Sequence, residues 1–193
     1  MKNYIRLGAV LLIFSAVAGL VLALINGQTA PIIAEMEFQK TTGAFTEIFG
    51  DEADAIEPMD EAVKMAIIEK YPNITDIFVV TKGGEVVGHG ITFTANGYGG
   101  GMSNAIALRV DKTIAGFRNI QHAETPGIGA QIEEPAYYEL FQNKSFADGQ
   151  VNGAVGAPGE NDVPLISGAT VSTAGILDSL NMLLPAYDEI LQG

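Results

Sequence analysis

The chain is organised around the stretch Ser167-Gly168-Ala169-Thr170-Val171-Ser172-Thr173, which comes just before an apolar segment with helical periodicity. Four of its seven residues carry hydroxyls, and the others are small or β-branched. A loop of this kind at a helix start presents free backbone N–H groups and the positive end of the helix dipole, which together suit a phosphate group. The alternative is that Ser and Thr only cap the helix, because their oxygens commonly accept hydrogen bonds from its first N–H groups.

The composition limits the classes of function. The chain has 193 residues, a formal net charge of −13 at pH 7 and no cysteine. The negative charge disfavours a nucleic-acid partner, since phosphates would be repelled. Without cysteine there is no disulfide framework, no Cys-ligated iron–sulfur cluster and no cysteinyl flavin link. The two histidines, His89 and His122, lack the usual zinc spacing, so we expect no metal site. Any redox chemistry would come from a cofactor held by other means.

The N-terminus predicts a membrane anchor. Lys2 and Arg6 precede an apolar run from Leu7 to Ile25 that contains no charged residue. A run of this length approaches the roughly 20 residues that a helix needs to cross a bilayer. A cleaved signal peptide is the alternative, but its apolar core is usually about 7–15 residues long and ends in a small-residue cleavage site. The charges before the run predict a cytoplasmic N-terminus. We assign residues 1–30 to a single-pass anchor, with the transmembrane segment at about 7–25.

Beyond the anchor, the periodicity predicts an α+β fold. We expect a helical linker and the start of an outer domain at residues 31–75, with an acidic loop at residues 50–60, and the main domain at residues 76–193. From Ile74 the residues become β-branched and apolar, which predicts a twisted antiparallel sheet packed with helices. The expected strands span residues 74–81, 85–94, 103–110 and 113–121.

Two loops and two helices complete the predicted domain. The glycine-rich loop at residues 95–101 should break the sheet, and it lacks the features of a nucleotide-binding loop. Thr125-Pro126-Gly127 predicts a turn, because Pro fixes one φ angle and Gly accepts a positive one. A helix is expected from Glu133 to Phe141. A last helix should run from Ser172 to about Leu191, with an interruption at Pro185.

Two of these stretches resemble the FMN-binding domain family, which is found in the G subunit of the Rnf complex and the C subunit of the sodium-pumping NADH:quinone oxidoreductase. Ser167-Gly168-Ala169-Thr170, followed by Val-Ser, is similar to the family's flavinylation motif. Upstream of it, Pro164 stands where the family usually has Asp. His122-Ala123-Glu124-Thr125-Pro126-Gly127-Ile128-Gly129 is similar to the family's His-x-Glu-Thr-Pro-Gly-Leu-Gly loop, which contacts the isoalloxazine ring. The resemblance covers roughly residues 90–185.

The resemblance implies an FMN site. Thr170 would carry FMN covalently through a phosphoester bond, and the other binding residues would come from both motifs and from the glycine-rich loop. No catalytic residue and no metal ligand are expected, although His122 and Glu124 are the alternative as an acid/base pair. The cofactor-binding residues so implied, besides Thr170, are Ser167, Gly168, Ala169, Glu124, Thr125, Pro126, Gly127, Ile128, Gly129 and Tyr98.

The resemblance also implies a role in electron transfer. We expect a membrane-anchored redox subunit, similar to the G subunit of the Rnf ferredoxin:NAD+ oxidoreductase, which couples electron flow to sodium or proton export. Its FMN domain would lie on the extracellular or periplasmic side of the cell membrane. Its partners would be other membrane and peripheral subunits of the complex, a flavin transferase for maturation, and membrane lipid. The alternatives are the C subunit of the sodium-pumping enzyme, whose members are generally longer, and a non-redox outer-face binding module.

Overall fold

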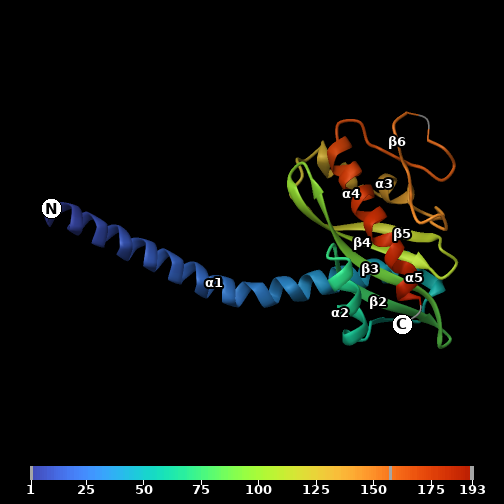
Figure 1. Ribbon diagram of the computed structural model, residues 1–193, viewed down its shortest axis with the longest axis horizontal. Helices are drawn as coiled ribbons and strands as arrows, with labels where there is room; N and C mark the ends of the chain where they lie inside the picture. Colours follow the sequence, from blue (N-terminus) through green and yellow to red (C-terminus); the bar gives the residue numbers. More distant parts are fainter. Residues whose placement is uncertain (1, 157, 192–193) are drawn as a thin grey trace. The chain divides into compact units, whose positions relative to one another are not determined.

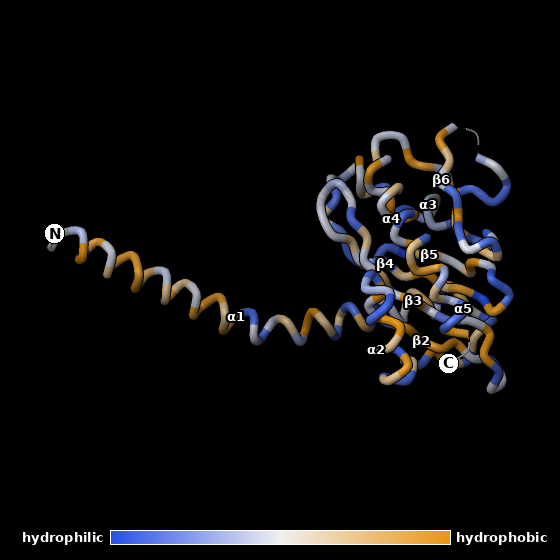
Figure 2. Tube along the Cα trace, in the orientation of Figure 1, coloured by the Kyte–Doolittle hydropathy of each residue, from blue (hydrophilic) through white to orange (hydrophobic). Residues whose placement is uncertain are grey.

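The computed structural model describes residues 2–156 and 158–191 and divides into two compact units, residues 1–40 and 41–193 (Figure 1). The predicted limits at residues 1 and 193 lie outside the described residues. Helix α1 (Lys2–Phe49) supplies the whole described first unit. Among the described residues it is the one helix long and apolar enough to cross a membrane, by length and composition. Figure 2 shows that hydrophobic residues dominate its N-terminal part.

The second unit is built on an antiparallel meander of five strands in the order β1-β2-β3-β4-β5. Four of them confirm the predicted strands, and the α+β fold prediction is confirmed. The fifth strand, β1, corrects the predicted acidic loop at residues 50–60. Residues 55–58 of that stretch form a strand that pairs with residues 78–81 of β2. The strands are β1 (Ala55–Pro58), β2 (Ile74–Lys82), β3 (Glu85–Gly97), β4 (Gly100–Arg109) and β5 (Ile114–Gln121).

The glycine-rich stretch does not break the sheet, contrary to the prediction. Strands β3 and β4 stay paired to the end of the hairpin, where Gly97 faces Gly100. Tyr98 and Gly99 alone form the turn. Glycines do not prevent this pairing, because ladder hydrogen bonds use backbone groups only. The hairpin therefore extends as a continuous ladder to an exposed tip at Tyr98.

Helices cover both faces of the sheet. Alternate residues of a strand point to opposite faces, and Ile106 and Ala107 of β4 accordingly belong to two separate apolar clusters. The larger cluster lies under α4 (Thr170–Leu183), and the smaller one contains Phe45 and Phe49 from the end of α1.

The remaining elements are short helices and strands that connect these parts. They are η1 (Gly50–Glu52), α2 (Glu61–Lys70), η2 (Gly129–Glu133), α3 (Pro135–Glu139), β6 (Gly153–Ala154), β7 (Val163–Pro164), η3 (Leu184–Ala186) and α5 (Tyr187–Ile190).

Helix α4 lies unusually close to strand β3. A Cβ atom added at Gly175 would stand 2.0 Å from the carbonyl oxygen of Asn96, so only glycine fits there. The apolar stripe of α4, including Ile176 and Leu180, is fully buried in the larger cluster. Pro185 lies in η3 after the end of α4, which confirms the predicted interruption of the last helix. The start of α4 is thereby held beside the far end of β3.

We predict that Phe45→Ala destabilises the second unit strongly. The Phe45 side chain is fully buried and its ring lies 5.4 Å from that of Phe78. Truncation of a buried aromatic residue leaves a cavity and typically costs about 3–5 kcal/mol in the free energy of unfolding. Urea denaturation of the full-length chain measures this loss. Met182→Ala is the matched control, since Met182 is 65% exposed and should change the free energy little. Equal effects of the two substitutions would contradict the assignment of Phe45 to the core.

A buried histidine should make the stability pH dependent. His89 is 4% exposed, and its ring packs edge-on against Tyr187. Burial lowers the pKa of His89 from 6.5 to about 4, because the charged imidazolium is poorly solvated there. Between these pH values the unfolded chain binds a proton that the folded chain does not. The contribution is therefore fully present above pH 6.5 and declines as the pH falls toward 4.

We expect His89 to remove roughly 3 kcal/mol from the free energy of unfolding over this range. Urea denaturation at a series of pH values from 7 to about 4 measures the decline, and His89→Gln provides the control. The difference between the two curves isolates the histidine, since carboxylates titrate in both proteins. Parallel curves would show that His89 does not cause the decline.

Candidate functional site

A pocket of about 370 Å³ lies where three segments of the second unit meet. These are the tip of the β3–β4 hairpin, the loop that follows β5, and the start of α4. The volume falls within the range of about 300–1,000 Å³ that is typical of small-molecule sites. The lining residues are Tyr98, Glu124, Thr125, Ile128, Gly129, Gly168, Ala169, Thr170, Val171 and Ser172.

Most residues of the predicted cofactor site line this pocket. The structure brings together Thr170, Gly168, Ala169, Glu124, Thr125, Ile128, Gly129 and Tyr98. Three predicted residues do not line it, namely Ser167, Pro126 and Gly127. Two lining residues were not predicted, Val171 and Ser172. They directly follow Thr170 in the motif, so their position in the same helix start was the signal that could have identified them.

The hydroxyl groups of the motif do not cap α4, so the capping interpretation is wrong. The N-cap residue is Ala169, and no side chain accepts a hydrogen bond from the N–H groups of this helix start. The hydroxyls donate elsewhere: Thr170 Oγ1 to the Ile166 carbonyl at 3.3 Å, and Thr173 Oγ1 to the Ala169 carbonyl at 3.1 Å. In the described structure the first turn of α4 thus keeps its N–H groups available for an anion.

The hydroxyl groups near the pocket differ sharply in exposure. Ser172 is 1% exposed and Thr173 is fully buried, and both hydroxyls donate to protein acceptors. Thr170 is exposed and lines the pocket, whereas Ser167 is exposed but lies outside the lining. Among the hydroxyls of the motif at residues 167–173, that of Thr170 is therefore the one that a molecule in the pocket can reach.

Large exposed apolar side chains stand around the pocket. Tyr98, Ile128 and Val171 are 81%, 52% and 58% exposed, and each comes from a different segment. Water-exposed apolar groups that gather at one concave site indicate a place where a ligand or partner is bound. Together they suit a flat, largely apolar ring system.

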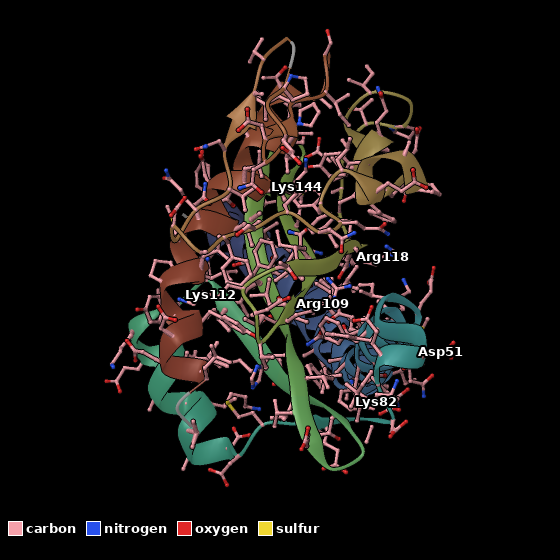
Figure 3. All side chains as sticks on the ribbon, turned by 90° about the vertical axis from the view of Figure 1, so that its right-hand side faces the viewer. Asp51, Lys82, Arg109, Lys112, Arg118 and Lys144 are labelled. Carbon is pink, nitrogen blue, oxygen red and sulfur yellow. The ribbon has the colours of Figure 1, made fainter. Side chains whose placement is uncertain are left out.

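No cationic side chain of the described residues lines the pocket. The described Lys and Arg residues of the second unit contact carboxylates or backbone carbonyls elsewhere; Figure 3 labels several of them. Arg109, Lys112 and Arg118 pair with Glu52, Asp188 and Glu47. Lys82 and Lys144 donate to the carbonyls of Asp51 and Glu160. An anion in the pocket would therefore be held by backbone N–H groups and not by a charged side chain.

The loop after β5 contains the predicted turn. Gly127 has a φ of +72°, and the Ile128 N–H donates to the Thr125 carbonyl at 3.1 Å. The residues expected to begin a helix at Glu133 form the end of η2 instead, and α3 begins at Pro135 because proline suits the first helical position.

His122 and Glu124 are not arranged as an acid/base pair. Nδ1 of His122 accepts the backbone N–H of Glu124 at 3.0 Å, and Nε2 lies 3.2 Å from the Glu133 carboxylate. Glu124 is buried, and its carboxylate accepts hydrogen bonds from Gly99 and Ser172. Both ring nitrogens of His122 are thus engaged away from the carboxylate of Glu124.

Comparison with known proteins identifies a family whose matched region contains the pocket. The family model of the FMN-binding domain matches residues 97–184, which include all three segments of the pocket. The G subunit of the Na(+)-translocating ferredoxin:NAD(+) oxidoreductase complex of Acetobacterium woodii is 31% identical, over 98% of this chain and 94% of the relative. The C subunit of the Na(+)-translocating NADH-quinone reductase of Pseudomonas aeruginosa is 28% identical, over 64% of this chain and 51% of the relative.

A solved structure shares the fold. It is the C subunit of the Na(+)-translocating NADH-quinone reductase from Parabacteroides distasonis, with a TM-score of 0.56 and 20% identity, covering 79% of this chain and 91% of that one. The sequence likeness to the Acetobacterium woodii protein extends over nearly the whole of both chains. The chain therefore belongs to the FMN-binding domain family, among relatives that include the G subunits of ion-translocating oxidoreductase complexes.

Proposed function

We propose that this chain is the G subunit of an Rnf-type ion-translocating ferredoxin:NAD+ oxidoreductase, an electron-transfer subunit anchored in the membrane. It carries FMN linked covalently to Thr170 on the outer face of the membrane. The observation that supports this most is the pocket itself, where the exposed hydroxyl of Thr170 lies at an uncapped helix start. The loop at residues 124–129 supplies another wall of the same pocket.

The residues of the pocket fit the two chemical parts of FMN. Bound FMN supplies reversible electron transfer, which the side chains of this cysteine-free chain cannot provide. The exposed apolar side chains of Tyr98, Ile128 and Val171 suit the isoalloxazine ring. The first-turn N–H groups and dipole of α4 suit the phosphate, with Thr170 at the same helix start.

The electrostatics favour a covalent link over simple binding. A helix N-terminus stabilises an anion by about 0.3–1 kcal/mol, and by up to about 2 kcal/mol when partly buried. Since about 1.4 kcal/mol corresponds to a factor of ten in affinity, this contribution alone retains a phosphate weakly. The described lining of the pocket adds no cation, and the chain carries a net charge of −13. An ester bond at Thr170 removes the need for a tight non-covalent phosphate site.

Attachment requires a base that the described pocket residues do not provide. The Thr170 hydroxyl donates its proton to the Ile166 carbonyl and must lose it to become a nucleophile. The carboxylate that lines the pocket, that of Glu124, already accepts two hydrogen bonds. We therefore assign the base to the flavin transferase, which must bind over the exposed Thr170. There the Thr170 oxygen would bond to the FMN phosphorus while the phosphoanhydride bond of a flavin dinucleotide donor breaks, so that the donor's nucleoside monophosphate leaves and the base takes the hydroxyl proton.

The anchor and its partners follow from α1 and from the relatives. The apolar run of α1 supports a membrane anchor at residues 1–30, and Lys2 and Arg6 before it favour a cytoplasmic N-terminus. Residues 31–75 then form the linker and the start of the outer domain, and residues 76–193 form the FMN-binding domain. The partners are membrane lipid and the other subunits of the complex, since the relatives are named as complex subunits.

The C subunit of the sodium-pumping NADH:quinone oxidoreductase is the second candidate. It is favoured by the likeness to the Pseudomonas aeruginosa protein and by the shared fold. However, the match covers about half the length of that relative and 94% of the Acetobacterium woodii protein, which supports the first candidate.

We predict that Thr170→Ala abolishes covalent flavin completely. Wild-type chain made together with a flavin transferase should fluoresce as a flavoprotein on a denaturing gel, and the variant should be dark. Ser167→Ala is the matched control, because it removes a nearby exposed hydroxyl outside the pocket lining and should keep its flavin. Flavin mapped to Ser167 or Ser172 by peptide mass would show that Thr170 is not the acceptor. A wild-type chain without flavin would favour the non-redox binding module.

We predict that the second unit lies outside the cytoplasm. Protease added to intact spheroplasts should digest residues 41–193, because the positive charges at Lys2 and Arg6 hold the N-terminus inside. A cytoplasmic marker protein must stay intact under the same conditions. Protection of the domain while known outer-face proteins are cut would reverse the proposed topology.

A further inference from the structure

Glu124 connects three segments that build the pocket. Its Oε1 accepts the backbone N–H of Gly99 at the hairpin tip at 2.9 Å, and its Oε2 accepts the hydroxyl of Ser172 in α4 at 2.8 Å. The residue itself belongs to the loop after β5 and is only 6% exposed. One carboxylate thus joins the hairpin tip, the loop and the helix start.

The surrounding backbone leaves room for this carboxylate. A Cβ atom at Gly97 would stand 2.1 Å from Oε1, and a Cβ atom at Gly129 would stand 2.1 Å from Oε2. Both distances are far below van der Waals contact, so any side chain there would displace the carboxylate. Glycine at these two positions, in two different segments, is therefore required for the Glu124 carboxylate to lie where it does.

Burial of the Glu124 carboxylate carries an energetic cost. A buried carboxylate normally pairs with a cation, because burial of an unpaired charge is strongly unfavourable. Among the described residues, Glu124 forms no ion pair. The groups that donate hydrogen bonds to its carboxylate are a backbone N–H and a hydroxyl. Ser172 stands in the first turn of α4, where the helix dipole favours a negative charge. The two hydrogen bonds and the helix dipole offset part of this cost. If the position served only core packing, an apolar side chain would be more stable there.

We propose that Glu124 is a positioning residue that fixes the walls of the FMN pocket relative to one another, an inference that rests on the proposed function. By holding Gly99, it sets the place of the neighbouring Tyr98. By holding Ser172, it sets the first turn of α4, which carries Thr170. It acts through these groups and takes no proton from Thr170.

The test uses the full-length chain, made with a flavin transferase and purified in detergent. Glu124→Ala removes both hydrogen bonds, and Ser172→Ala removes one. Glu124→Gln preserves the shape, since its amide oxygen can accept from Gly99 and its NH2 group can donate to the Ser172 hydroxyl. Tyr187→Phe is the matched control, because it removes a buried hydrogen bond to the Leu108 carbonyl outside the pocket.

The measurements are the absorption spectrum and midpoint potential of the bound flavin and the initial rate of flavin attachment. Glu124→Ala should change both flavin properties and slow attachment about fivefold for each hydrogen bond lost. Ser172→Ala should give a smaller change of the same sign. Glu124→Gln should restore the wild-type spectrum and attachment rate, while the midpoint potential rises because a negative charge in the pocket lining is lost. Tyr187→Phe should lower stability and leave the flavin spectrum and potential unchanged.

Several outcomes would overturn the proposal. One is a folded, flavin-loaded Glu124→Ala protein with wild-type spectrum and potential. Another is a Glu124→Gln protein whose spectrum and attachment rate match those of Glu124→Ala, which would assign the effect to charge and not to hydrogen bonding. If Glu124→Ala does not fold, Ser172→Ala decides, and a wild-type spectrum in that variant refutes the proposal.

Failure of the proposed function is distinguishable from failure of this inference. In the flavin-free Thr170→Ala chain, adding Glu124→Gln should keep the Gly99 amide protected from hydrogen exchange, and adding Glu124→Ala should expose it. Unchanged protection with Glu124→Ala would refute the positioning role whether or not the chain carries flavin. A wild-type chain without flavin would refute only the proposed function.

Discussion

The close approach of α4 to β3 is the constraint on which the site depends. Because Gly175 has no side chain, the helix contacts the backbone of Asn96 directly. The Asn73 side chain adds a hydrogen bond from the sheet side to the Ser179 carbonyl of α4, at 2.8 Å. With its buried stripe fixed in this way, α4 must begin beside the hairpin tip. The pocket is the space left between that beginning, the tip and the loop after β5.

A second constraint is electrostatic. The described cations of the second unit are engaged with acidic side chains or carbonyls, and none of them lines the pocket. A free phosphate would be attracted there only by backbone N–H groups, against a net charge of −13. Such a site suits a ligand that is tied to the chain. A pocket lining without a described cation is therefore consistent with the covalent link proposed at Thr170.

The sequence predicted the parts of the fold that rest on local patterns. Strands β2 to β5 have β-branched, apolar residues, and the last helix has a clear apolar stripe. Strand β1 was missed because its four residues, Ala55–Pro58, are too few to show alternation. The glycine-rich hairpin was predicted to be a break, since composition indicates flexibility while pairing depends on the backbone. The two motifs indicated the pocket, but the hydrogen bond between Glu124 and Ser172 joins residues 48 positions apart and has no local signal.

Burial, rather than intrinsic reactivity, selects among the hydroxyls of the motif. Ser and Thr hydroxyls are similar in chemistry, so the stretch from Ser167 to Thr173 offers several equivalent acceptors to an attaching enzyme. The fold buries Ser172 and Thr173 and occupies both hydroxyls with protein acceptors. Ser167 stays exposed but outside the pocket. Among the hydroxyl-bearing residues of the motif, Thr170 is the one that combines exposure with a place in the pocket lining, because it is the first residue of α4 and Ser172 and Thr173 lie on the buried side of that helix. The same helix register that builds the core therefore also favours Thr170 as the acceptor.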